Sequence, residues 1–502
     1  MKKIVILLCA LWCAGCGDFL DERSQDLVYA SSCADLDEIL IGDAYMNNEI
    51  PQFQLSVGSS GNYFPWLWVM DDDVEEFNRG TGDMGSLYLR DFYRWAEQPF
   101  NVNGVQLDDY EWERLYKHIS ATNVVLDLVG DFDGDSENLR NRVAGEAYFL
   151  RGLYYFLLAN MYSDPYQADK ANETPGVPLK TTSYMEDLKF FRTRHDTLYY
   201  HIAEDLMQAG LLLQGQNEEE KFRASSDAAW ALLSRVRLYM GDWEQVVAAC
   251  DMVNALDRRL EPLTENYNAD FIRVDNPEII FMSGSFCMRN IFGYLGGWMY
   301  RVSDDFLSLF GENEEYEDLR ETAWLTTNFV STRYVPAKVR SGMSASGSLK
   351  IADAVVIRYA EVLLNKAEAL VMLDREEEAV AVLEELLKNR YKDGKCPAIT
   401  ARGEELMDFI RTERRKELCF EGHRWFDLRR YAVNPKYPLT DYEIVHKVYD
   451  MPSNSGANQI GTARLKMFPE GKSWTLQIPA YEININPDIE INVRTDAEYV
   501  EL

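Results

Sequence analysis

Three short stretches of this chain carry side chains whose types and spacing could do chemistry. The first is GTGDMG, in which Gly80, Gly82 and Gly85 match the dinucleotide-binding pattern G-x-G-x-x-G. The residues before it, DDDVEEFNR, do not form a buried strand, and their carboxylates would repel a pyrophosphate. A flexible loop is therefore the better interpretation.

The second stretch is DFDGDSENL, which begins like a calcium-binding EF-hand loop with Asp131, Asp133 and Asp135. An EF-hand needs glycine at its sixth position and glutamate at its twelfth, where this chain has Ser136 and Arg142. The pattern does not predict an EF-hand, and an adventitious calcium site is the alternative.

Enzyme motifs do not single out catalytic residues. Neither H-E-x-x-H nor G-x-S-x-G occurs, and the chain has five histidines. The 83 acidic residues provide many carboxylate pairs, but nothing selects the two that a glycosidase needs. We predict no catalytic residue, no metal site and no cofactor, and keep a surface glycoside hydrolase as the less favoured alternative.

The third stretch is the pair Cys13 and Cys16 near the N-terminus. A redox motif would lie beside a βαβ pattern and a zinc site would need a second ligand pair; neither is found. Lys2 and Lys3 instead precede a short apolar run, residues 4–12, as in a signal peptide. The run is shorter than the roughly 18–20 residues that span a bilayer.

Cys16 follows two small residues, Ala14 and Gly15, and this arrangement resembles the bacterial lipoprotein box. One departure is that Cys13 stands where the box usually has leucine. The resemblance implies cleavage before Cys16 and acylation of its thiol, which would anchor the protein to a membrane. Plain secretion after cleavage is the alternative. The acidic residues that follow at once resemble the surface-export signals of Bacteroidetes lipoproteins; a solvated linker is the plainer interpretation.

The charge of the chain bears on which partners it can bind. The formal net charge is −32, and such a field repels phosphate backbones and anionic headgroups. Nucleic-acid binding is therefore disfavoured, and membrane attachment should come from lipid. Five cysteines beyond Cys16 are odd in number and scattered, so they predict no disulfide framework. They are Cys33, Cys250, Cys287, Cys396 and Cys419.

A weak internal repeat organises the helical segments. AAWALLSRVRLYMGDWEQVVAAC and YAEVLLNKAEALVMLDREEEAVAVLEELL run four, seven and five residues between equivalent landmarks, a spacing that resembles a tetratricopeptide helix–turn–helix. The equivalent landmarks are Trp230/Leu363, Ser234/Ala367, Gly241/Asp374 and Val246/Ala379. Further helices of this kind are expected at residues 112–129 and 145–164. The pattern predicts a mainly α protein built on an α-superhelical scaffold of such helix pairs.

Three long stretches without periodicity interrupt the helices and are rich in Gly, Asn and aromatic residues. They cover about residues 51–108, 283–302 and 326–349. Long irregular segments in a packed protein are usually functional. We expect a loop-rich ligand-binding region there.

The segment RTERRKELCFEGHRWFDLRRYAVNP, residues 411–435, resembles the C-terminal signature of SusD/RagB-like proteins, the surface lipoproteins that work beside outer-membrane transporters. Further stretches agree with that family in order along the chain. They are DFLD after the lipid cysteine, WERLYKHISATNVVLD, NPEIIF, DAVVIRYAEVLLNKAEA and LQIPAYEININPDIEIN.

The resemblance implies residues 1–15 as a lipoprotein signal peptide, 16–29 as a lipid-anchored linker and 30–502 as the SusD-like domain. It also implies non-catalytic capture of a nutrient, in the outer membrane at the cell surface, for a SusC-like TonB-dependent transporter. The nutrient is expected to be a glycan oligomer; RagB-like members make an oligopeptide the alternative. The charged signature itself is interpreted as a helix pair that holds the scaffold together.

Ligand contacts are expected from aromatic residues in the loops, because sugars present flat C–H faces and hydroxylated edges. The first candidates are Trp95, Phe100, Asn103, Tyr294, Trp298 and Tyr300, and the second are Trp66, Trp68 and Trp324. Packing in the core is the competing interpretation for each ring.

Overall fold

A computed structural model gives the structure of the protein. It describes residues 30–46, 63–77, 84–102, 104–184, 186, 189–217, 219–254, 258–284, 288, 291–292, 300–311, 315–327, 334–340, 351–450 and 458–502. Cys16, Asn103, Tyr294 and Trp298 lie outside the described residues.

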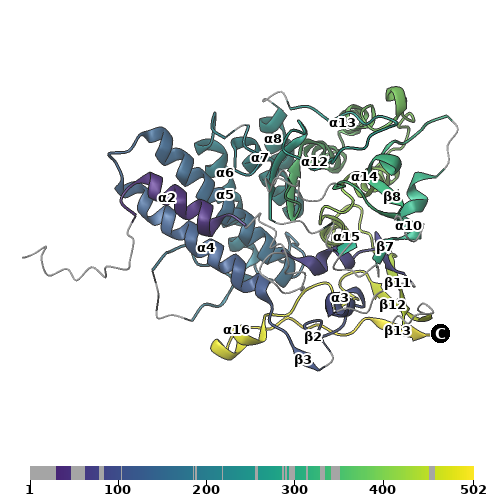
Figure 1. The fold of residues 1–502 in the computed structure, drawn as a ribbon, viewed down its shortest axis with the longest axis horizontal. Coiled ribbons are helices and arrows are strands. Elements are labelled where there is room, and N and C mark those ends of the chain that lie inside the picture. The colour runs from purple at the N-terminus through teal and green to yellow at the C-terminus, as the bar shows by residue number, and fades with distance from the viewer. Residues whose placement is uncertain are drawn as a thin grey trace, which may run out of the picture.

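Helices form most of the scaffold, as the sequence predicts. Consecutive helices pack on one another from α4 to α8, and α8 packs on α12. In Figure 1 they form an arc that runs from α2, α4, α5 and α6 on one side to α12, α13 and α14 on the other. The long helices are α4 (Tyr110–Leu128), α5 (Glu137–Tyr162), α6 (His195–Leu212), α7 (Ser226–Met240), α8 (Trp243–Asn254), α12 (Tyr359–Met372), α13 (Glu376–Leu387), α14 (Glu404–Glu417) and α15 (Arg424–Ala432).

Shorter helical elements connect or flank these. They are α2 (Cys33–Ile39), η1 (Leu40–Ala44), η2 (Pro65–Val69), α3 (Met84–Tyr93), η3 (Val129–Asp131), α10 (Asp304–Leu307), η5 (Ser308–Phe310), α11 (Arg320–Trp324), η6 (Lys392–Gly394) and α16 (Ala480–Ile485).

The predicted repeat is confirmed as the helix pairs α7–α8 and α12–α13. The two turns occupy equivalent positions, and each uses a residue in the left-handed region: Gly241 with φ 73° and Asp374 with φ 58°. The landmark Ser234 is buried, and its hydroxyl accepts a hydrogen bond of 3.0 Å from Asn365 of the second pair. The two repeats therefore pack against each other as well as resembling each other.

Small residues and caps set where the helices cross and begin. A Cβ added at Gly210 of α6 would lie 2.6 Å from Cε2 of Trp230 on α7, so only glycine fits this crossing. Ser225 caps α7 by accepting a hydrogen bond from the backbone N–H of Ala228, and Ser136 caps α5 in the same way. Asp135, from the stretch that begins like an EF-hand, accepts from the backbone N–H of Cys33 at 2.7 Å.

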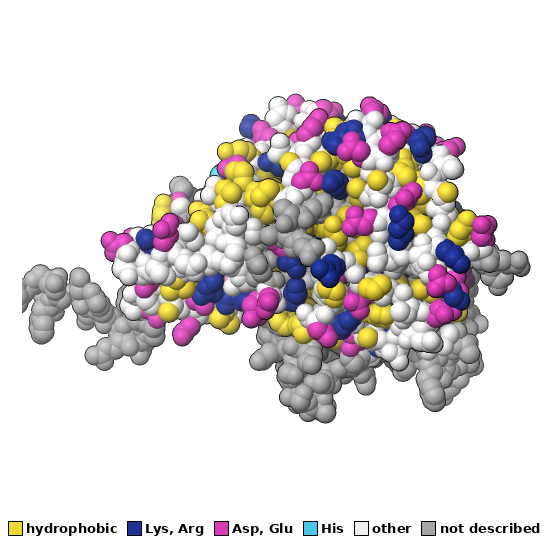
Figure 2. All heavy atoms as spheres, turned by 90° about the horizontal axis from the view of Figure 1, so that it is seen from above, with side chains coloured by type: hydrophobic (Ala, Val, Ile, Leu, Met, Phe, Trp, Pro, Cys, Tyr) yellow, Lys and Arg dark blue, Asp and Glu magenta, His cyan; other side chains and the backbone are white. Residues whose placement is uncertain are grey.

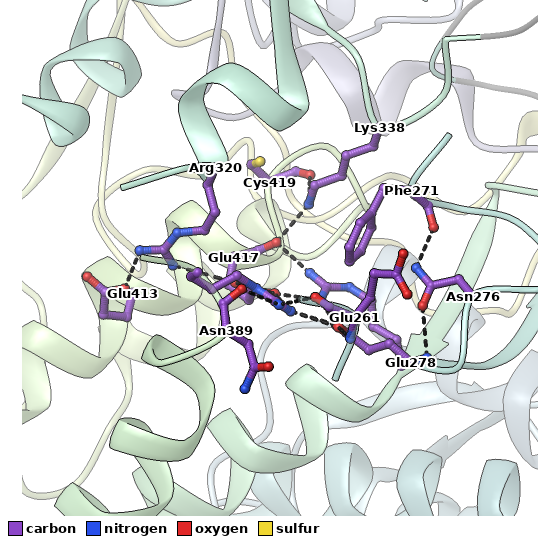
Figure 3. A network of polar contacts seen from close by, with 12 residues as sticks. Glu261, Phe271, Asn276, Glu278, Arg320, Lys338, Asn389, Glu413, Glu417 and Cys419 are labelled. Carbon is purple, nitrogen blue, oxygen red and sulfur yellow. Dashed lines mark hydrogen bonds and ion pairs between the residues drawn. The ribbon is translucent and has the colours of Figure 1, made fainter. Parts of the chain in front are cut away.

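A buried network of charges joins α14 to the rest of the scaffold (Figure 3). Glu417 accepts from Arg390 at 2.8 Å and from Arg358 at 2.6 Å, and all three side chains are almost fully buried. Arg390 also pairs with Glu278 at 2.8 Å, and Arg358 pairs with Glu421 at 2.8 Å. Buried charges are tolerated because each one meets an opposite charge and hydrogen-bond partners.

Two further cations extend this network. The ammonium of Lys338 donates to Glu421 at 2.5 Å and to the main-chain carbonyl of Cys419 at 2.9 Å. Arg320 of α11 pairs with Glu413 at 2.7 Å. The signature motif is thus a structural device, as predicted, and it also fixes segments that border the irregular stretches.

The strands form small antiparallel sheets. The pairs are β1 (Val74–Glu76) with β7 (Tyr300–Val302), β6 (Ile279–Ser283) with β10 (Val355–Arg358), β2 (Asn101–Val102) with β3 (Val105–Gln106), β4 (Pro175–Pro178) with β5 (Arg192–Arg194), and β8 (Leu325–Thr327) with β9 (Tyr334–Pro336). One three-stranded sheet has the order β11 (Glu443–Tyr449), β12 (Gln459–Lys466) and β13 (Glu498–Glu501).

Within the described part of the chain, no helix is long and apolar enough to cross a bilayer. Figure 2 shows basic and acidic side chains interspersed over the face seen from above, with apolar side chains between them.

Candidate ligand-binding face

The predicted loop regions share a base around Gly284, which has φ +83° and follows β6. A Cβ added there would lie 2.5 Å from the Cβ of Ala354 and 3.3 Å from both Met46 Sδ and Tyr63 Cδ2. Met46 and Tyr63 stand on either side of residues 47–62, and Gly284 and Ala354 border the second and third irregular stretches. The ends of three segments that are distant in sequence therefore lie in contact.

Strands β1 and β7 bring further ends of these regions together. Glu76 is opposite Tyr300 in the ladder, and the guanidinium of Arg301 lies 5.1 Å from the ring centroid of Phe77. Strand β7 also contacts β9, the second strand of the β8–β9 hairpin. All three predicted loop regions, 51–108, 283–302 and 326–349, are thus rooted in neighbouring positions. We call this area the loop base.

Two carboxylates that directly precede β1, those of Asp72 and Asp73, form ion pairs with the α14–α15 helix pair. Asp73 pairs with Arg415 at 2.7 Å, and Asp72 pairs with Arg424 at 2.7 Å. Burial opposes ionisation of Asp72, but the charges of Arg415 and Arg424 outweigh it and hold its pKa well below the usual range. Burial, aided by the charge of Asp72, raises the pKa of Asp73 to about 6.

Asp71, Asp72 and Asp73 are close enough together to hold a metal ion. The carboxylates of Asp72 and Asp73 already pair with guanidinium groups, which disfavour a second cation at the same carboxylates. The cluster is best explained as an ion-paired anchor between η2, β1 and the helix pair.

Strand β1 is fixed from its other side by α3 and β11. The backbone N–H of Glu76 donates to the hydroxyl of Tyr93 at 2.8 Å, and that hydroxyl donates to the carbonyl of Lys447 at 3.0 Å. The carboxylate of Glu76 pairs with Arg90 at 3.2 Å. Strand β1 of the loop base is therefore held in place by hydrogen bonds and an ion pair.

Trp95 and Tyr300, two predicted ligand-binding residues, have no exposed ring face here, which corrects the expectation of open aromatic planes. Trp95 is fully buried; its Nε1 donates to the carbonyl of Met70 at 2.8 Å, and its ring stacks on His446 with centroids 4.2 Å apart. Tyr300 is also fully buried, 5.5 Å from the ring of Tyr93. Rings packed in this way stabilise the loop base and offer no plane to a sugar.

The second set of candidates is buried as well. Trp66 stacks on Phe92 at 5.5 Å, Trp324 meets Phe271 edge-on at 5.0 Å, and Trp68 is 4 % exposed. Packing in the core, the competing interpretation, describes all three in this structure.

Phe100 is the described candidate with a partly open environment. Its ring packs edge-on against Phe92 at 5.0 Å and borders a hollow of about 220 Å³. Leu107, Asp109, Ile478 and Tyr481 line the same hollow. Tyr481 was not among the predicted site residues, although it lies within the quoted stretch LQIPAYEININPDIEIN.

Comparisons with known proteins divide the chain into two matched parts. A model described as "SusD family" matches residues 291–494, and one described as "Starch-binding associating with outer membrane" matches residues 18–238. Among curated proteins, SusD-like protein P2 of Formosa agariphila is 25 % identical over 69 % of this chain and 80 % of its own length. SusD-like protein P25 of the same organism is 25 % identical over 54 % of this chain and 49 % of its own length.

Solved structures share the fold. A SusD-like carbohydrate binding protein from Bacteroides vulgatus has a TM-score of 0.68 and 21 % identity, covering 93 % of this chain and 98 % of its own. A SusD superfamily protein from Bacteroides thetaiotaomicron has a TM-score of 0.68 and 23 % identity, covering 92 % and 100 %.

Proposed function

We propose that this chain is a SusD-like protein that captures an oligosaccharide at the outer membrane, because the family models match residues 18–238 and 291–494. The observation that carries the proposal is the loop base, where the ends of three irregular regions lie close together on the helical scaffold. Such an arrangement suits recognition of a ligand by loops, with the scaffold setting their positions. The matched description of starch binding and outer-membrane association favours a glycan over a peptide.

The capture is proposed to be non-catalytic. Asn103, Tyr294 and Trp298 remain our proposed ligand contacts among the residues outside the described part, and Phe100 joins them from the described part. Trp95, Tyr300, Trp66, Trp68 and Trp324 serve as packing residues instead.

Delivery is proposed to follow capture. Residues 1–15 act as the signal peptide, Cys16 carries lipid, residues 16–29 form the linker, and residues 30–502 form the ligand-binding domain. A lipid tether would hold this protein in one membrane plane with a SusC-like TonB-dependent transporter, which raises their effective concentration. Affinity purification from native outer membranes in mild detergent tests the partnership; recovering the protein with no large barrel protein at comparable abundance contradicts it.

Binding panels test the capture itself. The purified full-length protein in detergent is titrated with neutral and acidic oligosaccharides and with oligopeptides, and the mixtures are analysed for cleavage products. Binding of a glycan without turnover supports the proposal. Binding of peptides alone supports the RagB-like alternative, and release of shortened products supports a hydrolase.

A further inference from the structure

A second cavity lies between α4, α16 and the chain between β4 and β5. It has a volume of about 380 Å³ and is lined by Trp112 and Tyr116 of α4, Phe190 and Tyr481 of α16. We call it the α16 groove. In Figure 1, α16 protrudes at the lower left, well away from β7 at the loop base.

The rings of the α16 groove are fixed by contacts that leave part of their surface open. The hydroxyl of Tyr116 donates to the carbonyl of Pro178 at 2.7 Å, and the hydroxyl of Tyr481 donates to the carbonyl of Asp109 at 3.0 Å. Both of these tyrosines and Phe190 are half-buried, whereas Trp112 is 3 % exposed and forms the floor. A groove whose rings are already held in place loses little conformational entropy when a ligand enters.

The apolar lining is aromatic rather than aliphatic. Among the described residues that line the groove, the apolar ones are Trp112, Tyr116, Phe190, Tyr481 and Pro178, without Leu, Ile, Val or Met. Interleaved aliphatic side chains would suit an amphipathic helix of a partner protein. Flat ring surfaces suit a ligand with flat C–H faces, as sugars have.

The rim of the groove carries two ammonium groups and two carboxylates. Lys117 and Lys180 provide ammonium groups, and Glu113 and Glu482 provide carboxylates. Lys180 is positioned by Glu186 at 2.9 Å and lies 5.5 Å from the ring centroid of Phe190. The formal charge of the rim is therefore balanced in a chain whose net charge is −32. Balanced charge suits a neutral, polyhydroxylated ligand and gives no preference to an anion or a cation.

We propose that the α16 groove is a second carbohydrate-binding site, which holds a neutral segment of a glycan chain apart from the loop base. The proposal rests on the proposed function in taking the ligand to be a glycan. Two separate sites on one protein would engage a long chain at two points, and the second contact then forms at high effective concentration.

The test uses calorimetric titration of the full-length protein in detergent with neutral glucans, mannans, xylans and galactans, each as a trimer and as a polymer. The variants are Phe190→Ala and Tyr116→Ala, with Tyr116→Phe as the conservative change; neither residue borders the hollow beside Phe100, whereas Tyr481 lines both. Tyr200→Ala is the matched control, because Tyr200 is an aromatic residue on α6 that is 59 % exposed and does not line the groove.

We expect the two groove variants to weaken polymer binding by about tenfold or more and to lower the trimer stoichiometry from two to one. Tyr116→Phe and Tyr200→Ala should match the wild type, and circular dichroism should show that every variant is folded. Unchanged polymer affinity and stoichiometry in Phe190→Ala and Tyr116→Ala would overturn the second site while leaving the proposed function intact. Failure of the wild type to bind any glycan in this neutral panel would overturn the second site, and failure with the acidic oligosaccharides as well would overturn the proposed function.

Discussion

Substituting Glu417 by Gln should destabilise the protein far more than its small change of shape suggests. The side chain of Glu417 is fully buried and accepts from Arg390 at 2.8 and 2.9 Å and from Arg358 at 2.6 Å. Glutamine keeps the size and one acceptor oxygen, but it removes the negative charge between buried guanidinium groups. Removing one partner from a buried ion pair typically costs about 3–5 kcal/mol in the free energy of unfolding.

The matched control is Glu384→Gln on α13. Glu384 pairs with Lys388 at 3.4 Å, and both side chains are largely exposed. Exposed pairs of this kind contribute about 0–1 kcal/mol. Urea denaturation at pH 7, followed by circular dichroism, gives both changes in the free energy of unfolding; urea is preferred because it does not screen charges. Equal and small effects of the two substitutions would refute an energetic role for the network.

The pH dependence provides a second check on the same residue. Burial opposes ionisation of Glu417, but Arg390, Arg358 and Arg320 outweigh it and lower its pKa far below that of an unfolded glutamate. The stabilisation is therefore complete above the unfolded pKa of about 4.3 and is lost as the pH falls towards the folded pKa. The stability gap between wild type and Glu417→Gln should hold from pH 7 to about 5 and shrink below about pH 4. A gap that widens in acid would contradict this assignment of charges.

Two further predictions concern the anchor and a helix crossing. Cys16→Ser should abolish incorporation of a fatty-acid analogue in metabolic labelling and release the protein from membranes; undiminished label would count against lipidation at Cys16. Gly210→Ala should destabilise the protein by about 1–3 kcal/mol, because the added methyl would lie 2.6 Å from the Trp230 ring. Gly130→Ala, where the methyl would meet no atom within 4 Å, is its control, and equal melting temperatures for the two variants would refute the close crossing.

The helical scaffold could be predicted because its signals are local. The landmark residues of α7–α8 and α12–α13 recur at fixed spacing, and the turns at Gly241 and Asp374 lie where that spacing places them. The role of residues 411–435 was predictable for the same reason, since a helix rich in both charges favours pairing along and between helices. The residues that pair with this segment could not be predicted, because Glu278, Lys338 and Arg358 are distant from residues 411–435 in the sequence.

Exposure of aromatic residues could not be read from local sequence. Trp95 follows α3 in a stretch that resembles a loop, but its ring is covered by His446, more than 300 residues further along the chain. At the α16 groove, rings expected in the core instead border an open groove. Trp112 and Tyr116 fit the apolar stripe of a helix, and they reach an open groove because Phe190 and Tyr481 arrive from distant segments. In both cases long-range packing decides which ring faces water.

The ammonium of Lys338 is buried within a segment, residues 334–340, that lies between two stretches outside the described residues. Its bonds to Glu421 and to the carbonyls of Glu417 and Cys419 attach that segment to the scaffold from within. Arg320 of α11 attaches the start of β8 in a similar way, because its guanidinium donates to Glu413 of the scaffold. Such anchors fix the attachment points of stretches that we propose to contact ligand, so the length and composition of those stretches could be changed while the attachment points stay in place. Variants that differ only between these anchors would test how those stretches affect ligand choice while the contacts of the scaffold stay the same.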